Sequence, residues 1–182
     1  MKRLLVIVRH GDGSSELSDQ GRLQIRNLKK IIETRIAEVF EEEKVRSIYF
    51  SFSFLERAFQ SAKGLAFGGD VIVTDLYLTE RRGISYPERI LEKVLAIADC
   101  YCAQVITIVA HGDMPSVIAE TAYEYITGKQ LSEQLCNVGK ACGYVIDMNT
   151  GEIVFITHEP PRPDPIVRKP ITTGFSDDYV VF

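Results

Sequence analysis

The chain has 182 residues and a formal net charge of −4; 46% of its residues are hydrophobic and 25% are charged. These values are typical of one globular domain that is large enough to bury a full core. The net charge is negative, so nucleic acid is not an expected partner. No apolar run is long enough to cross a membrane. The four irregularly spaced cysteines favour reduced thiols over a disulfide scaffold, which predicts a cytoplasmic protein.

The first predicted element is a buried strand that ends in a cation and an imidazole. Residues 4–8 form a continuous apolar run, as in strands that are covered on both faces of a parallel sheet. Arg9, His10 and Gly11 follow directly. Ligands of open α/β sheets bind beyond the carboxyl ends of the strands, so Arg9 and His10 are expected at the mouth of a cleft. The alternative is a solvated strand end.

A helix and a second strand are predicted next. Ser18 is a candidate N-cap, and apolar residues recur at steps of three and four over residues 25–39, which marks one buried helical face. Residues 47–51 then have the composition of a strand.

A second helix is predicted from a capping box. Ser53 and Glu56 have the required spacing, so the helix is expected to start at Phe54. Arg57 then falls in the first turn, where its charge opposes the helix dipole. Either water screens an exposed arginine, or an anion is bound between Arg57 and the N–H groups of the helix start.

A third strand is expected at residues 71–74, followed by a charged loop that carries Glu80. Ser85 and Glu88 form another capping box, and this predicts a third helix. Its expected buried face consists of Ile90, Leu91, Val94, Leu95, Ala98 and Tyr101.

A fourth buried strand, residues 105–110, ends at His111 and a glycine. This repeats the pattern at His10, so a second imidazole is expected at the same edge of the sheet. Pro115 then opens a helix that is predicted to close at Gly128.

The last regular elements are predicted strands at residues 142–147 and 153–156, which a turn-rich link joins into an antiparallel hairpin. The alternation of strands and helices predicts a three-layer α/β/α sandwich with a mostly parallel sheet. Five of the seven prolines fall within residues 160–170. We therefore expect one domain over residues 1–158 and an extended proline-rich tail over residues 159–182.

Three blocks of the chain occur in a recognisable order. They are Arg-His-Gly at residues 9–11 with Leu-Ser-Asp-Gln-Gly at 17–21, Ser-x-x-x-Arg-Ala-x-Gln-Ser-Ala at 53–62, and His-Gly at 111–112. Together they resemble the histidine phosphatase superfamily, which includes the phosphoglycerate mutases. The short loop after Gly11 and the late hairpin are most similar to its small phosphohistidine phosphatase branch. The resemblance implies a phosphohistidine intermediate on His10, with neither a metal nor a cofactor.

The residue types also suit this chemistry on their own. A phosphoryl group carries two negative charges and needs several donors around its oxygens, which Arg9, Arg57 and His111 can supply, with Gly11 beside them. A neutral ring nitrogen of His10 can attack phosphorus and hold the group until water releases it. The sequence supplies no cluster of metal ligands.

A leaving alcohol also needs a proton. The resemblance makes Glu80 the candidate acid, and Asp113 is a rival. A resemblance to the smallest phosphohistidine phosphatases implies no such carboxylate. The expected partner is a phosphorylated small molecule or a phosphoprotein. Two other functions remain open: a phosphoglycerate mutase-like transferase, and a phosphate- or partner-binding module without catalysis.

Overall fold

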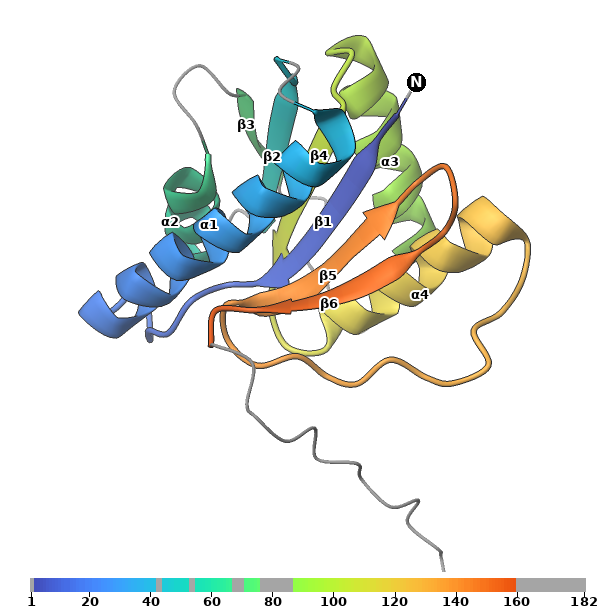
Figure 1. The fold of residues 1–182 in the computed structure, drawn as a ribbon. Coiled ribbons are helices and arrows are strands. Elements are labelled where there is room, and N and C mark those ends of the chain that lie inside the picture. Colours follow the sequence, from blue (N-terminus) through green and yellow to red (C-terminus); the bar gives the residue numbers. More distant parts are fainter. Residues whose placement is uncertain (1, 42–43, 53–54, 67–70, 76–86, 160–182) are drawn as a thin grey trace, which may run out of the picture.

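The structure, a computed structural model, describes residues 2–41, 44–52, 55–66, 71–75 and 87–159. Six strands and four helices occur in these residues (Figure 1). In chain order they are β1 (Leu4–Arg9), α1 (Asp19–Phe40), β2 (Ser47–Phe52), α2 (Glu56–Leu65), β3 (Val71–Asp75), α3 (Pro87–Cys100), β4 (Val105–Ala110), α4 (Met114–Thr127), β5 (Cys142–Asp147) and β6 (Ile153–Thr157).

The strands form one sheet in the order β3-β2-β4-β1-β5-β6. Neighbours from β3 to β1 pair in parallel, and β5 pairs antiparallel with both β1 and β6. The two connections through α1 and α2 both run toward β3, whereas the connection through α3 runs back. Because such crossovers are right-handed, α1 and α2 cover one face and α3 covers the other, where it packs against α4. The predicted three-layer α/β/α sandwich with a C-terminal hairpin is confirmed.

The interior strands carry the core. Every residue of β4 is buried, as are the first five residues of β1. Their pairing sets Arg9 opposite Ala110, so His10 and His111 follow adjacent parallel strands at the same edge of the sheet. The sequence pattern thus correctly placed both imidazoles at one edge.

The two predicted helix ends at Ser18 and Gly128 are confirmed. The Ser18 Oγ accepts the Gly21 N–H at 3.0 Å at the start of α1, and Gly128, with φ of 66°, ends α4. The predicted start of α2 is wrong, since α2 begins at Glu56 with Leu55 as an N-cap that has no side-chain hydrogen bond. Ser53 and Phe54 lie outside the described residues, as do Ser85 of the next predicted capping box and the predicted proline-rich tail from residue 160 onward.

Tyr101 does not belong to the buried face of α3. The helix ends at Cys100, and Tyr101 lies in the following turn with 49% of its surface exposed. The five other predicted residues of that face are buried. All four cysteines are free: Cys142 is buried and the other three are exposed. None of the helices in the described part of the chain is long and apolar enough to span a membrane.

Candidate active site

His10 occupies the centre of the candidate site, directly after β1, and only 3% of its surface is exposed. Its Nδ1 lies 2.7 Å from the Gly11 carbonyl oxygen, and its Nε2 lies 2.9 Å from the Nε of Arg57. An arginine can only donate, so Nε2 must be the acceptor of this second bond. The ring therefore carries its proton on Nδ1, where it donates to Gly11, and keeps a lone pair on Nε2.

The surroundings of His10 also keep its ring neutral. Burial is the main cause that lowers the pKa of His10 from 6.5 to about 4, and the nearby charges of Arg57, Arg9 and His111 add to it. The hydrogen bond to Gly11 opposes this shift without cancelling it. At neutral pH the Nε2 lone pair is therefore available as a nucleophile.

Arg57, in the first turn of α2, joins His10 to the loop that follows β1. Besides the bond to His10, its guanidinium donates to the carbonyl oxygen of Ser14, and its main-chain N–H donates to the Ser15 carbonyl at 3.2 Å. The Arg57 N–H at the start of α2 is thus already hydrogen-bonded within the protein. An anion at this place would be bound by the guanidinium rather than by that amide.

Arg9 is the last residue of β1 and points toward a different loop. Its Nη1 donates to the Val138 carbonyl oxygen at 3.1 Å. Its Nε is buried and has no hydrogen-bond partner in the described part of the chain. A buried donor of this kind is expected to have a partner, and an oxyanion is a suitable one.

Gly11 and His111 are both brought to the site. Gly11 donates its N–H to the Ser61 Oγ at 3.1 Å, and this hydroxyl donates to the Arg57 carbonyl at 2.7 Å. Gly11 thus orients His10 through its carbonyl, while its N–H is already used. His111, half-buried after β4, is close enough to lower the pKa of His10. Glu80 lies outside the described residues, and Asp113 is the exposed N-cap of α4.

We call residues 11–18 the first loop. Its contacts come largely from side chains. The Gln24 Oε1 accepts the Asp12 N–H at 2.8 Å, and the Gln60 Oε1 accepts the Leu17 N–H at 2.9 Å. A Cβ on Gly21 would lie 2.0 Å from the Asp12 carbonyl oxygen, so only glycine allows α1 to start this close to the loop.

We call residues 136–141, just before β5, the second loop; that it borders the site was not predicted from the sequence. The Ala141 N–H donates to both the Arg9 carbonyl, at 3.1 Å, and the His10 carbonyl, at 3.0 Å. Lys140 forms an ion pair with Asp12 of the first loop, and its hydrogen bond lowers the pKa of Asp12. The only hint in the sequence was a long stretch without helical or strand periodicity between α4 and β5.

The described residues contain no group of three or more His, Cys, Asp or Glu side chains that could hold a metal ion.

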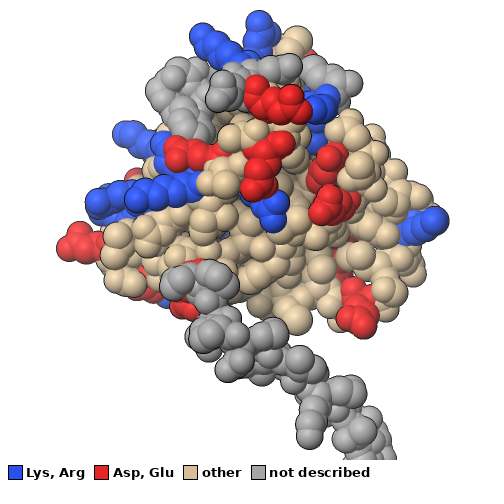
Figure 2. All heavy atoms as spheres, in the orientation of Figure 1, with Lys and Arg blue, Asp and Glu red and all other residues tan. Residues whose placement is uncertain are grey.

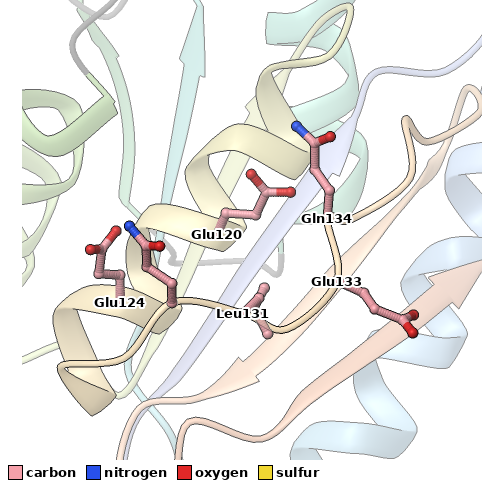
Figure 3. Close-up of a pocket in the computed structure, with 6 residues that line it drawn as sticks. Glu120, Glu124, Leu131, Glu133 and Gln134 are labelled. Carbon is pink, nitrogen blue, oxygen red and sulfur yellow. The ribbon is translucent and has the colours of Figure 1, made fainter.

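A hollow of about 230 Å³ lies between α4 and the segment that follows it (Figure 3). Its lining includes Glu120, Glu124 and Glu133, and the Glu120 Oε1 accepts the Leu135 N–H at 2.6 Å. Three carboxylates repel a phosphate, so this hollow is not part of the candidate phosphate site.

Comparison with known proteins shows that the fold is a known one. No family model matches the chain, and no curated protein matches it in sequence. Among solved structures, the protein histidine phosphatase SixA complexed with tungstate is 14% identical with a TM-score of 0.52, and the match covers 84% of this chain and 94% of that one.

Two mycobacterial proteins match to a similar extent. Glucosyl-3-phosphoglycerate phosphatase is 16% identical with a TM-score of 0.53, over 85% of this chain and 97% of its own. The product of an open reading frame of Mycobacterium tuberculosis is 15% identical with a TM-score of 0.56, over 86% of this chain and 99% of its own. The resemblance to histidine phosphatases is therefore confirmed at the level of the fold.

Proposed function

We propose that the chain is a metal-independent phosphatase that hydrolyses a phosphate monoester or a phosphohistidine through a phosphoryl intermediate on His10. One observation carries the proposal. The buried His10 ring holds its proton on Nδ1 and presents an unprotonated Nε2 to the guanidinium of Arg57. A nucleophile and a phosphate-binding cation thus meet at one point. A module that only bound phosphate would not need the nucleophile.

In the first step, the Nε2 lone pair attacks phosphorus, and the bond from phosphorus to the leaving group breaks with its electron pair. Arg57 donates to this lone pair in the structure, so its guanidinium must turn from Nε2 to the phosphoryl oxygens. Charge-assisted hydrogen bonds to those oxygens replace the bond that is lost. Arg9 and His111 add donors from the adjacent strand ends. The Nδ1–H bond to Gly11 stabilises the positive ring of the phosphohistidine.

In the second step, water attacks phosphorus and the bond from phosphorus to Nε2 breaks. Inorganic phosphate leaves, and Nε2 recovers its lone pair. Because the surroundings of His10 disfavour a charged imidazole, they also favour this return to the neutral ring.

The leaving group also needs a proton in the first step. Asp12 is a poor acid, because Lys140 lowers the pKa of its carboxyl group. Asp113 and Glu80 remain candidates for an alcohol leaving group. An imidazole leaving group needs less help, so a phosphohistidine substrate requires neither carboxylate.

The solved structures support a phosphorylated substrate, since one is a protein histidine phosphatase and another a glucosyl-3-phosphoglycerate phosphatase. The proposed partner is accordingly a phosphoprotein or a phosphorylated small molecule. We assign catalysis to residues 1–158 and none to the proline-rich tail. Four free cysteines suit a reducing compartment, so the proposed location is the cytoplasm.

Rapid-quench labelling tests the proposal. Mixing the protein with labelled phosphoramidate or p-nitrophenyl phosphate should give an acid-labile, base-stable adduct on His10 within the first turnover. The His10→Ala variant should give neither adduct nor product, whereas His158→Ala, a matched histidine change, should give both. A chelator should leave the rate unchanged. Full turnover by His10→Ala would exclude the mechanism, and phosphate transfer to phosphoglycerate in place of water would favour the mutase alternative.

A further inference from the structure

The helix α1 has an unusual order of charges. Its first twelve residues include four basic residues, and its last turn carries none. A helix dipole favours the opposite order, with cations at the carboxyl end. The helix dipole therefore does not account for this arrangement.

Three of these cations form an exposed stripe. Arg22, Arg26 and Lys30 follow each other at steps of four residues, which places them along one side of the helix. No side-chain hydrogen bond or ion pair joins them to other residues of the described chain. Figure 2 shows Lys and Arg side chains along α1, at the left of the molecule. We call these three residues the basic stripe.

The basic stripe begins beside the candidate site. Gly21, which precedes Arg22, packs against Asp12, two residues from His10. The Gln24 side chain accepts the Asp12 N–H from the next part of the same turn. A phosphorylated partner bound at His10 therefore lies next to the start of α1.

The dimensions of the stripe fit a macromolecule. Arg22 and Lys30 are eight residues apart in sequence, which corresponds to about 12 Å along the helix and is more than a phosphoryl group needs. Leu23, with 48% of its surface exposed, lies next to Arg22 and offers apolar contact. Protein interfaces combine such side chains with arginine, whereas a chain of net charge −4 repels nucleic acid over the rest of its surface.

We propose that the basic stripe is the docking surface for an acidic face of a phosphoprotein substrate. The stripe and the positive end of the α1 dipole bind this face and thereby bring its phosphoryl group to His10. This inference rests on the proposed phosphatase function and assigns a substrate class to it. Dephosphorylation of small molecules does not require the stripe.

Charge reversal tests the docking surface. The variant R22E/R26E/K30E is compared with K44E/R46E/K129E, which makes the same charge change at exposed residues of other segments. The probes are two phosphohistidine peptides of equal length, one flanked by glutamates and one by serines, together with p-nitrophenyl phosphate. At low ionic strength the wild type and the control should prefer the acidic peptide by about tenfold in kcat/KM. The stripe variant should lose this preference and keep its rate with p-nitrophenyl phosphate.

Three results would overturn the proposal. In the first, the stripe variant retains the preference for the acidic peptide; in the second, the control variant loses this preference equally. In the third, the stripe variant loses as much activity with p-nitrophenyl phosphate as with the acidic peptide, and this would indicate a general attraction of anions. Fluorescence anisotropy with the unphosphorylated acidic peptide measures docking separately from turnover. If the protein binds this peptide through the stripe but has no phosphatase activity, the docking proposal stands and only the proposed phosphatase function is contradicted. Stripe-dependent binding of single-stranded RNA with no binding of the peptide would identify a nucleic-acid surface instead.

Discussion

The first and second loops both border His10, and each is held by one arginine. Arg57 donates to the Ser14 carbonyl in the first loop, and Arg9 donates to the Val138 carbonyl in the second. The loops differ in what else fixes them. Side chains of α1 and α2 hold the first loop, whereas the main chain of the second loop binds directly to the main chain of Arg9 and His10.

This difference explains why the first loop, but not the second, was recognised from the sequence. A loop held by serine and glutamine side chains, with a close main-chain approach that only glycine allows, leaves those residue types at fixed spacings. A loop held by its own amides and carbonyls accepts many residue types, because every residue except proline supplies both groups. Substitutions can therefore break the first loop selectively.

The largest expected effect comes from Arg57, which binds both the first loop and His10. Arg57→Ala should lower kcat/KM with p-nitrophenyl phosphate by roughly 10²–10³-fold, as for the loss of one preorganised donor to a transition state. It should also raise the pKa of His10, because the Arg57 charge helps to lower it. Arg35→Ala, a matched change in an exposed arginine paired with Glu38, should leave both quantities unchanged.

Glycine substitutions compare the packing of the two loops. Gly21→Ala places a Cβ 2.0 Å from the Asp12 carbonyl oxygen, so we expect a loss of about 1–3 kcal/mol or more in the free energy of unfolding. This outweighs the roughly 1 kcal/mol by which alanine favours a helix. Gly139→Ala in the second loop meets only the Cys142 Sγ at 3.7 Å and should change stability by less than about 0.5 kcal/mol. Equal effects in urea unfolding would refute the packing argument.

Two buried serines test whether a side chain holds the first loop. Ser61 accepts the Gly11 N–H, so Ser61→Ala leaves a buried donor unpaired and should cost about 1–3 kcal/mol. The Ser51 Oγ is equally buried but has no hydrogen-bond partner among the described residues, so Ser51→Ala should be neutral or stabilising. The test is a comparison of their unfolding midpoints in urea. The argument fails if Ser51→Ala is the more damaging change.

The smallest effect is expected where the two loops meet. Asp12 and Lys140 are both partly exposed, so their ion pair should shift the thermal midpoint by about 2 °C or less, and added salt should remove the shift. The pKa of Asp12 is lowered, so this contribution is present at neutral pH and disappears as pH falls and the carboxyl group is protonated. A double-mutant cycle of Asp12→Asn and Lys140→Met measures it. A coupling that persists in high salt would show that the pair is shielded from solvent.

Local patterns predicted most of the fold. Apolar runs located the buried strands, and Ser18 and Gly128 marked helix ends that the structure confirms. The start of α2 was misplaced because a capping-box spacing does not by itself determine the first helical residue, which is Glu56. The sequence also could not reveal that Arg57 donates to Nε2 of His10. Such a bond depends on how α2 meets β1 in three dimensions, and these elements are far apart in the chain.

The most direct test of the account is a pH titration of His10 by ¹⁵N NMR, assigned with the His10→Gln variant. We expect the Nδ1–H tautomer and a pKa of about 4, well below the ordinary 6.5. As pH falls from 6.5 toward 4, the unfolded chain binds this proton first. The free energy of unfolding of the wild type should therefore fall by about 3 kcal/mol relative to that of His10→Gln between pH 6.5 and pH 4. Above pH 6.5 this contribution to stability is complete. A His10 that titrates at or above 6.5, or that carries its proton on Nε2, would contradict the assignment of this ring as the nucleophile.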